Sequence, residues 1–67
     1  MLEVEVWTIK NVVIAELPKL GDCLHLFRIR KLTVCCMCGL GSVGRVLCEA
    51  LNQLRPKAEL IIFQGLP

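Results

Sequence analysis

Two short apolar runs with an amphipathic repeat between them determine what the second half of the chain can form. The first run, Leu32–Cys38, is rich in β-branched residues and cysteine, as expected of a strand buried on both faces. From residue 43 to residue 54, apolar side chains recur at the i, i+3, i+4 and i+7 spacing of one helix face. Pro56 ends that helix, and Ala58–Phe63 has the length and composition of a second buried strand. This order predicts a βαβ unit, in which the two strands are parallel.

The start of the chain predicts extended structure with weaker signals. The segment LEVEVW alternates between apolar and acidic side chains before its tryptophan. Leu2, Val4 and Val6 are therefore expected on the buried face of a strand. Lys10-Asn11 is a weak turn signal, which leaves a hairpin open as an interpretation of the residues around it.

Three further observations complete the expected organisation. Residues 17–22 contain proline and glycine and read as a loop, whereas the alternation of residues 27–30 favours a strand. A shift in composition near residue 31 divides the chain into a strand and loop segment, residues 1–31, and the βαβ unit, residues 32–67. The expected fold class is α/β, with a small βαβ core, one parallel strand pair and an N-terminal β or irregular segment.

Composition limits the classes of function. The net charge of +2 is too small, and the three aromatic residues are too few, to indicate a nucleic-acid partner. No apolar run approaches the roughly 18 residues that cross a bilayer, so no transmembrane segment is expected. Glu3 and Glu5 stand where a secretory signal carries basic residues, and five cysteines without such a signal indicate a reducing, cytoplasmic compartment. The apolar content of 55% in so short a chain favours burial in a complex or self-association.

A glycine-rich segment joins the first buried strand of the βαβ unit to its helix. Such a turn presents backbone N–H groups at the positive end of the helix dipole, and glycine lets an anion approach the backbone closely. Ser42 is a good N-cap for this helix, and Arg45 on the first turn adds positive charge. The sequence therefore predicts an anion site between residues 39 and 44.

The same segment has the G-x-G-x-x-G spacing of a dinucleotide-binding turn, formed by Gly39, Gly41 and Gly44 after a strand and before a helix. In this interpretation the three glycines bind a cofactor. The acidic residue that would hold the ribose is missing, because Phe63 and Gln64 stand at the end of the second strand. A truncated dinucleotide-binding motif is therefore an alternative hypothesis.

The order Cys36-Met37-Cys38-Gly39-Leu40-Gly41-Ser42, followed by a helix and a strand, resembles a known family. It is similar to the C-x-x-G-x-G-[ST] motif of the IIB phosphocarrier domain of sugar phosphotransferase systems and of IIB-like domains in sugar-responsive regulators, over residues 31–65. The resemblance implies that Cys36 is the catalytic residue and takes a phosphoryl group from a histidine of a partner protein. It also implies a phosphate site without a cofactor, formed by Gly39, Leu40, Gly41 and Ser42, and Arg45 supplies a nearby positive charge.

Other interpretations stay open for these residues. Cys35, Cys36 and Cys38 are equally consistent with small apolar residues that fill a buried strand. Cys23 and His25, taken with Cys36 and Cys38, only loosely resemble the ligand pairs of structural zinc, and no metal site is expected. An exposed edge of the first strand suits a third class, a small interaction or accessory protein with no small-molecule site.

Overall fold

The protein forms one sheet of three parallel strands in the order β1-β2-β3. The computed structural model describes residues 1–42 and 44–66, apart from the side chain of Ser42. The strands are β1 (Leu2–Val12), β2 (Phe27–Cys36) and β3 (Ala58–Gln64). β2 pairs with β1 on one side and with β3 on the other, so it is the central strand.

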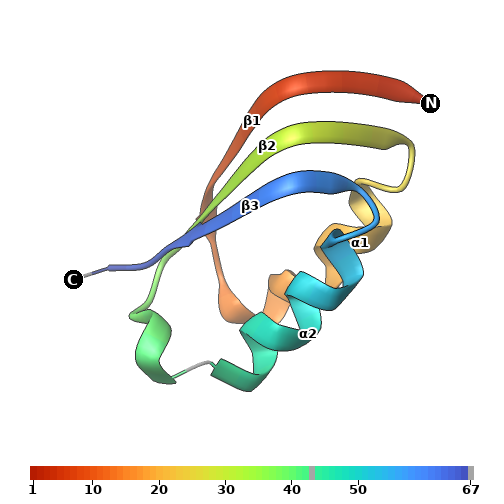
Figure 1. The fold of residues 1–67 in the computed structure, drawn as a ribbon. Coiled ribbons are helices and arrows are strands. Elements are labelled where there is room, and N and C mark those ends of the chain that lie inside the picture. Colours follow the sequence, from red (N-terminus) through yellow and green to blue (C-terminus); the bar gives the residue numbers. More distant parts are fainter. Residues whose placement is uncertain (43, 67) are drawn as a thin grey trace.

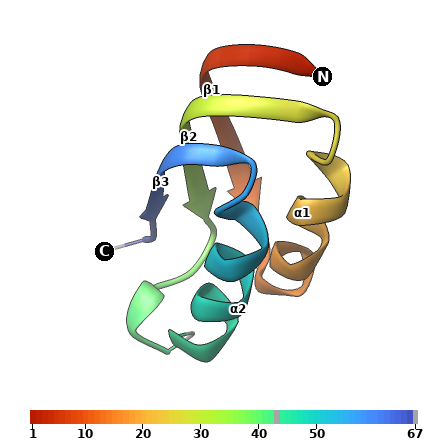
Figure 2. The ribbon, with the colours of Figure 1, turned by 45° about the vertical axis from the view of Figure 1, so that its right-hand side comes forward.

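Helical segments connect the strands and lie on one face of the sheet (Figures 1 and 2). The 3₁₀ helix η1 (Ile14–Lys19) and the short α1 (Leu20–Cys23) join β1 to β2. The 3₁₀ turn η2 (Leu40–Ser42) and α2 (Gly44–Leu54) join β2 to β3. The predicted α/β class with its βαβ core is confirmed, and the sheet has a third parallel strand beyond the predicted pair.

The hydrophobic core lies between the sheet and these helices. β2 contributes three fully buried side chains. The residues that pack against them come from η1, α1, the turn after α1, and α2. The buried apolar residues are Val12, Leu17, Leu20, Leu24, Ile29, Leu32, Val34, Cys36, Ala50, Leu54 and Ala58. On the sheet, Trp7 and Phe27 add an edge-to-face aromatic pair with ring centroids 4.8 Å apart.

The prediction of a loop over residues 17–22 is wrong, because this segment is helical. Leu17 and Leu20 are buried, and Leu24 follows on the same face at a helical spacing. Pro18 is the fifth of the six residues of η1 and stands two residues before α1 begins, where its ring fixes a φ that a helix also uses. Burial of three leucines outweighs the local proline and glycine signals.

The strands bend midway, and this bend changes which side chains face the core (Figure 1). At the bend each strand carries two consecutive exposed residues: Glu5 and Val6, Arg30 and Lys31, and Glu59 and Leu60. Val4 and Trp7 therefore both pack against the core, although they are three residues apart. Leu2 and Val6 are 60% and 62% exposed, so their predicted place on the buried face is wrong.

A hairpin at Lys10-Asn11 is also absent, since β1 continues through both residues to Val12. The pairing register with β2 shifts between Ile9 and Val12 instead. Asn11 has a φ of 59°, the left-handed conformation that asparagine tolerates better than most residues. The local signal was therefore real, but it marks an irregularity in the strand.

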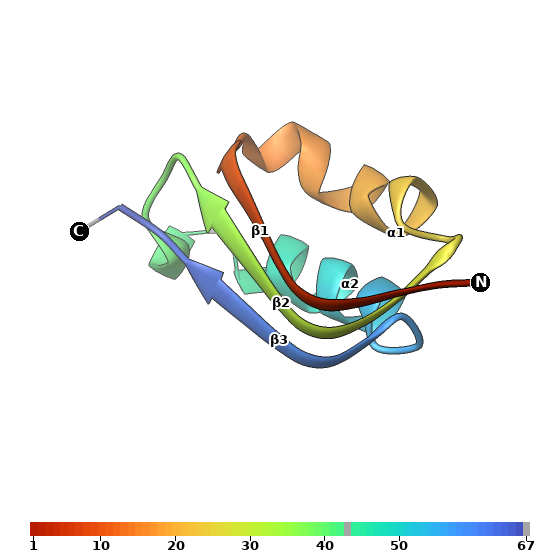
Figure 3. The same ribbon diagram turned by 90° about the horizontal axis from the view of Figure 1, so that it is seen from above.

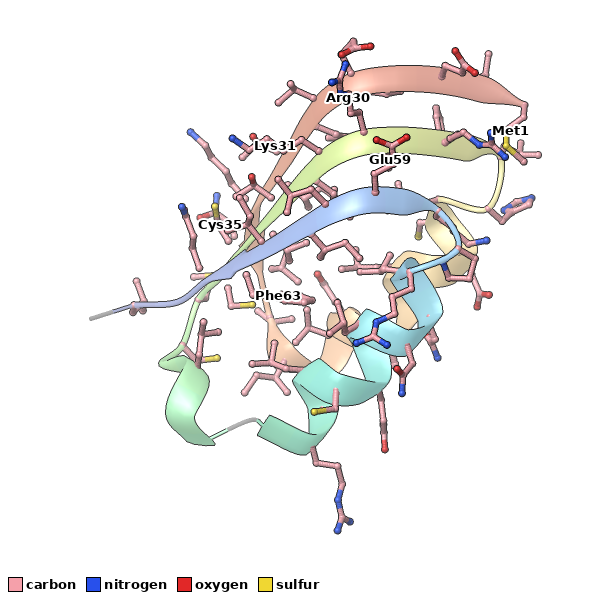
Figure 4. The ribbon with its side chains drawn as sticks, in the orientation of Figure 1. Met1, Arg30, Lys31, Cys35, Glu59 and Phe63 are labelled. Carbon is pink, nitrogen blue, oxygen red and sulfur yellow. The ribbon has the colours of Figure 1, made fainter. Side chains whose placement is uncertain are left out.

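The boundary expected near residue 31 falls inside β2, which runs from Phe27 to Cys36. The first 31 residues supply β1 and part of β2 to the same sheet as the βαβ unit. In the part of the chain that the structure describes, helices lie on only one face of this sheet: Phe63 lies on the helix side, while Lys31 and Cys35 lie on the opposite side (Figure 4). Parallel sheets are usually covered on both faces, so this uncovered face is unusual.

None of the helices in the described part of the chain has the length and apolar character needed to cross a membrane.

Candidate functional site

The glycine-rich segment begins at the carboxyl end of the central strand. After β2 ends at Cys36, the Met37 N–H still donates to the Val12 carbonyl oxygen at 2.9 Å, which ties this turn to β1. The chain then enters η2, and α2 begins only at Gly44. Figure 1 shows η2 between the end of β2 and the start of α2, so the helix does not follow the strand directly.

Cys36, the predicted phosphoryl acceptor, lies in the core. Its exposed fraction is 4%, and it belongs to the same buried cluster as Val34. Burial raises the pKa of the Cys36 thiol above its ordinary value, and the neighbouring Cys38 and Cys35 raise it further. A raised pKa favours the neutral thiol, whereas a nucleophile needs the thiolate. In this conformation Cys36 is therefore screened from an incoming phosphoryl group.

The two neighbouring cysteines have different surroundings. Cys35 is half-buried on the uncovered face of the sheet, and its thiol donates to the Gln64 side-chain carbonyl at 3.5 Å (Figure 4). Cys38 is half-buried and packs against the core from the turn after β2. All five cysteines carry free thiols. Core filling therefore describes Cys36 best, and Cys35 is a partly exposed thiol on the other face.

The predicted phosphate-binding residues lie in the segment from the end of β2 to the first turn of α2. Gly39 and Gly41 are exposed, Leu40 is half-buried against the core, and Arg45 is exposed on the first turn of α2. The backbone of Ser42 belongs to η2, while its predicted roles as N-cap and phosphate ligand depend on a side chain outside the described part of the structure. The first turn of α2 carries no acidic residue, so no carboxylate competes for the positive end of the helix.

The three glycines of the dinucleotide pattern do not have the tight surroundings that such a motif uses. Its third glycine allows close packing of the helix on the strand. A Cβ added at Gly44 or Gly41 would meet no atom within 4 Å, and one at Gly39 would lie 3.8 Å from the Leu66 carbonyl oxygen. The structure thus adds nothing in favour of the dinucleotide hypothesis.

A contact that sequence reasoning missed holds the C-terminal tail against the glycine-rich segment. The Leu66 N–H donates to the Cys38 carbonyl oxygen at 3.0 Å, which continues the direction of β3 beyond Gln64. At Gly65 an added Cβ would stand 2.6 Å from the same carbonyl oxygen and 2.7 Å from Leu40. The glycine that directly follows the last strand was the available signal, since glycine permits close approach of two backbones.

A shallow pocket of about 260 Å³ opens beside this contact at the carboxyl edge of the sheet. The pocket is lined by Lys10 and Asn11 from β1, by Cys35, Cys36 and Met37 at the end of β2, and by Gln64, Gly65 and Leu66. Ligands of parallel α/β sheets generally bind outside the carboxyl ends of the strands. Sequence reasoning did not select Lys10 or Gln64 as site residues, because only the sheet brings them to the same edge, on opposite sides of β2.

The loosely metal-like cysteine and histidine pairs do not meet. Cys23 and His25 lie before β2, and Cys36 and Cys38 lie at its far end. The His25 Nδ1–H donates to the Asp22 carbonyl oxygen at 2.6 Å, a contact at the end of α1. Across residues 1–42 and 44–66, no three histidine, cysteine or acidic side chains gather as a metal site would require.

Comparison of the chain with protein-family models, curated proteins and solved structures finds no match. Functional inference therefore depends on the geometry above.

Proposed function

We propose that the chain is a small α/β domain that recognises a phosphate group at residues 39–45, as a sensor of the IIB-like type. The observation that supports this best is the start of α2. Its first turn has no acidic residue, it carries the exposed Arg45, and open space surrounds Gly41 and Gly44. A dianion is favoured at such a helix end by both the dipole and the guanidinium group.

Recognition is better supported than covalent transfer. A phosphocysteine requires a thiolate that is open to the donor, and Cys36 is buried with a raised pKa. A reversibly bound phosphate needs only the backbone and Arg45, both of which are at the surface. The phosphocarrier activity implied by the resemblance would require the Cys36 side chain to leave the core.

The proposal is tested by the effect of inorganic phosphate on stability. A ligand that binds the folded state alone adds RT ln(1 + [L]/Kd), or about 1.4 kcal/mol when phosphate stands about tenfold above its Kd. Phosphate also stabilises proteins non-specifically because it is excluded from their surfaces. Urea denaturation is therefore compared between Arg45→Gln and Arg55→Gln, which remove one exposed guanidinium at opposite ends of α2.

Arg45→Gln is expected to weaken the phosphate effect at least about tenfold in Kd, since a hydrogen bond to a charged group contributes about 1.5–3 kcal/mol. Arg55→Gln and Cys36→Ala should retain the effect. Equal stabilisation of the two arginine variants would show that the effect is non-specific and would overturn the proposal. Loss of the effect in Cys36→Ala alone would instead favour the phosphocarrier hypothesis.

A second candidate function, protein interaction without a small-molecule site, is favoured by the uncovered face of the sheet. Val6 and Leu60 are 62% and 51% exposed there, on opposite sides of Lys31 in one row of paired residues. Exposed apolar side chains on an uncovered parallel sheet are typical of a surface that contacts another layer. This candidate predicts that phosphate does not stabilise the protein specifically, and that the protein associates with a partner through the sheet.

A further inference from the structure

The two outer strands of the sheet differ in how they are protected against pairing with another strand. β1 carries Glu3, Glu5 and Lys10, and its register shifts before Val12. Charged side chains and irregular register are the usual devices that keep an edge strand from adding a partner. In Figure 3, η1 and α1 also lie on the side of β1. The β1 edge is therefore protected.

The β3 edge lacks these devices. Glu59 is the single charged residue of β3, and no charged residue follows from Leu60 to Leu66. The register of β3 with β2 is regular from Lys31 to Cys35. β3 forms the outer edge of the sheet in Figure 3, with η1 and α1 on the far side. An apolar, regular edge strand leaves backbone groups ready to pair with another strand.

We propose that β3 pairs antiparallel with β3 of a second copy of this chain, across a two-fold axis near Ile62. In this register Leu60 lies opposite Gln64 of the other copy, and the two Glu59 carboxylates lie at opposite ends of the contact. The two three-stranded sheets then form one continuous sheet. The pairing also places Leu60 and Ile62 of both copies next to one another on the uncovered face.

The chemistry of the β3 edge selects a second copy over an unrelated strand. A two-fold contact brings the same surface together twice, so a surface that pairs with itself must be free of like charges at its centre. The segment from Leu60 to Gln64 meets this condition, and displacement of Glu59 from the axis avoids repulsion. A foreign strand with charged residues would place them beside Leu60 and Ile62 without a partner.

The test uses matched substitutions at the two edges of the same sheet. Val6 and Leu60 are both exposed and both pair with Lys31, so Val6→Lys and Leu60→Lys place the same charge in one row at opposite edges. Thr8 and Ile62 flank Thr33 in the same way and give a second matched pair, Thr8→Lys and Ile62→Lys. Mass is measured by sedimentation equilibrium under reducing conditions, because five free thiols could otherwise cross-link copies.

The fraction of wild-type protein that is dimeric is expected to rise with protein concentration. Leu60→Lys and Ile62→Lys should each raise the dimer dissociation constant at least about tenfold, while Val6→Lys and Thr8→Lys leave it unchanged. Circular dichroism establishes whether each variant folds. If Ile62→Lys unfolds, Leu60→Lys still tests the contact, because Leu60 is already exposed. A monomer at every concentration overturns the proposal. Equal weakening by substitutions at both edges, or by neither, overturns it too, because the contact would then lie elsewhere.

Discussion

Replacing Gly65 with alanine tests how closely the C-terminal tail lies against the segment after β2. The added Cβ would stand 2.6 Å from the Cys38 carbonyl oxygen and 2.7 Å from Cγ of Leu40. None of the described glycines has a positive φ, so backbone conformation does not itself require glycine at this position. The expected effect therefore comes from steric contact alone.

Two ways of relieving this contact set the magnitude. If the tail stays in place, overpacking costs about 1–3 kcal/mol. If the tail detaches, the protein loses the hydrogen bond from Leu66 to Cys38, which contributes about 0.5–1.5 kcal/mol. Little burial is lost in that case, because Leu66 is 57% exposed. The protein will relieve the contact in the way that costs less free energy. Gly65→Ala should therefore lower the free energy of unfolding by about 1 kcal/mol and Tm by about 4–8 °C.

Urea denaturation and amide hydrogen exchange together measure this effect. Gly65→Ala should lose both stability and protection of the Leu66 amide, because the tail has moved away from Cys38. Gly41→Ala is the control, since a Cβ there would meet no atom within 4 Å. An unchanged stability with a protected Leu66 amide, or an equal loss in Gly41→Ala, would refute the steric argument.

Three further predictions follow from the core, the start of α2 and the buried thiol. Leu32→Ala removes a fully buried side chain from the central strand and should lower the free energy of unfolding by about 2–5 kcal/mol. Because so small a domain is only marginally stable, urea denaturation should then find much of the variant unfolded even at low urea. Gly44→Ala should raise the free energy of unfolding by up to about 1 kcal/mol, because the helix gains alanine without a clash; a loss would show that Gly44 is tightly packed. Since the folded pKa of Cys36 is raised, its contribution to stability should be complete below the unfolded thiol pKa of about 8.5 and fall as pH rises through the folded value. Urea denaturation midpoints across this pH range should fall in the wild type and not in Cys36→Ala. A parallel fall in both proteins would show that the loss of stability does not come from Cys36.

The helix and strand of the second half could be predicted from periodicity alone. The apolar repeat that ends at Leu54 and the run from Ala58 both became the expected elements, with Pro56 in the turn between them. These signals are local, because a helix face or a buried strand repeats within a few residues. The α/β class followed from their order.

The errors arose where tertiary packing overrides a local signal. Leu17 and Leu20 are buried as part of helical segments although proline and glycine accompany them. Val6 is exposed because the sheet bends, and alternation within one strand cannot reveal a bend that all three strands share. Lys10-Asn11 is only a weak turn signal, and pairing with β2 decides that it marks a shifted register within β1 and not a hairpin.

The position of the glycine-rich segment could be predicted from the sequence, whereas the burial of its cysteine could not. Gly39 and Gly41 lie between β2 and α2, and Gly44 and Arg45 lie on the first turn of α2, as the order of elements predicts. Burial of Cys36 depends on which face of β2 it occupies, and the bend sets that face, so the motif alone could not supply it. Lys10 and Gln64 line the pocket at the carboxyl edge of the sheet because β1 and β3 lie on opposite sides of β2, an arrangement that no local pattern encodes.

The most direct measurement is an amide NMR titration of the protein with inorganic phosphate at constant ionic strength. The proposed phosphate site predicts saturable shifts centred on Gly41, Gly44 and Arg45, which disappear in Arg45→Gln and persist in Cys36→Ala. Shifts that are absent from these residues, or that spread over all exposed cations without saturation, would contradict phosphate recognition at the start of α2.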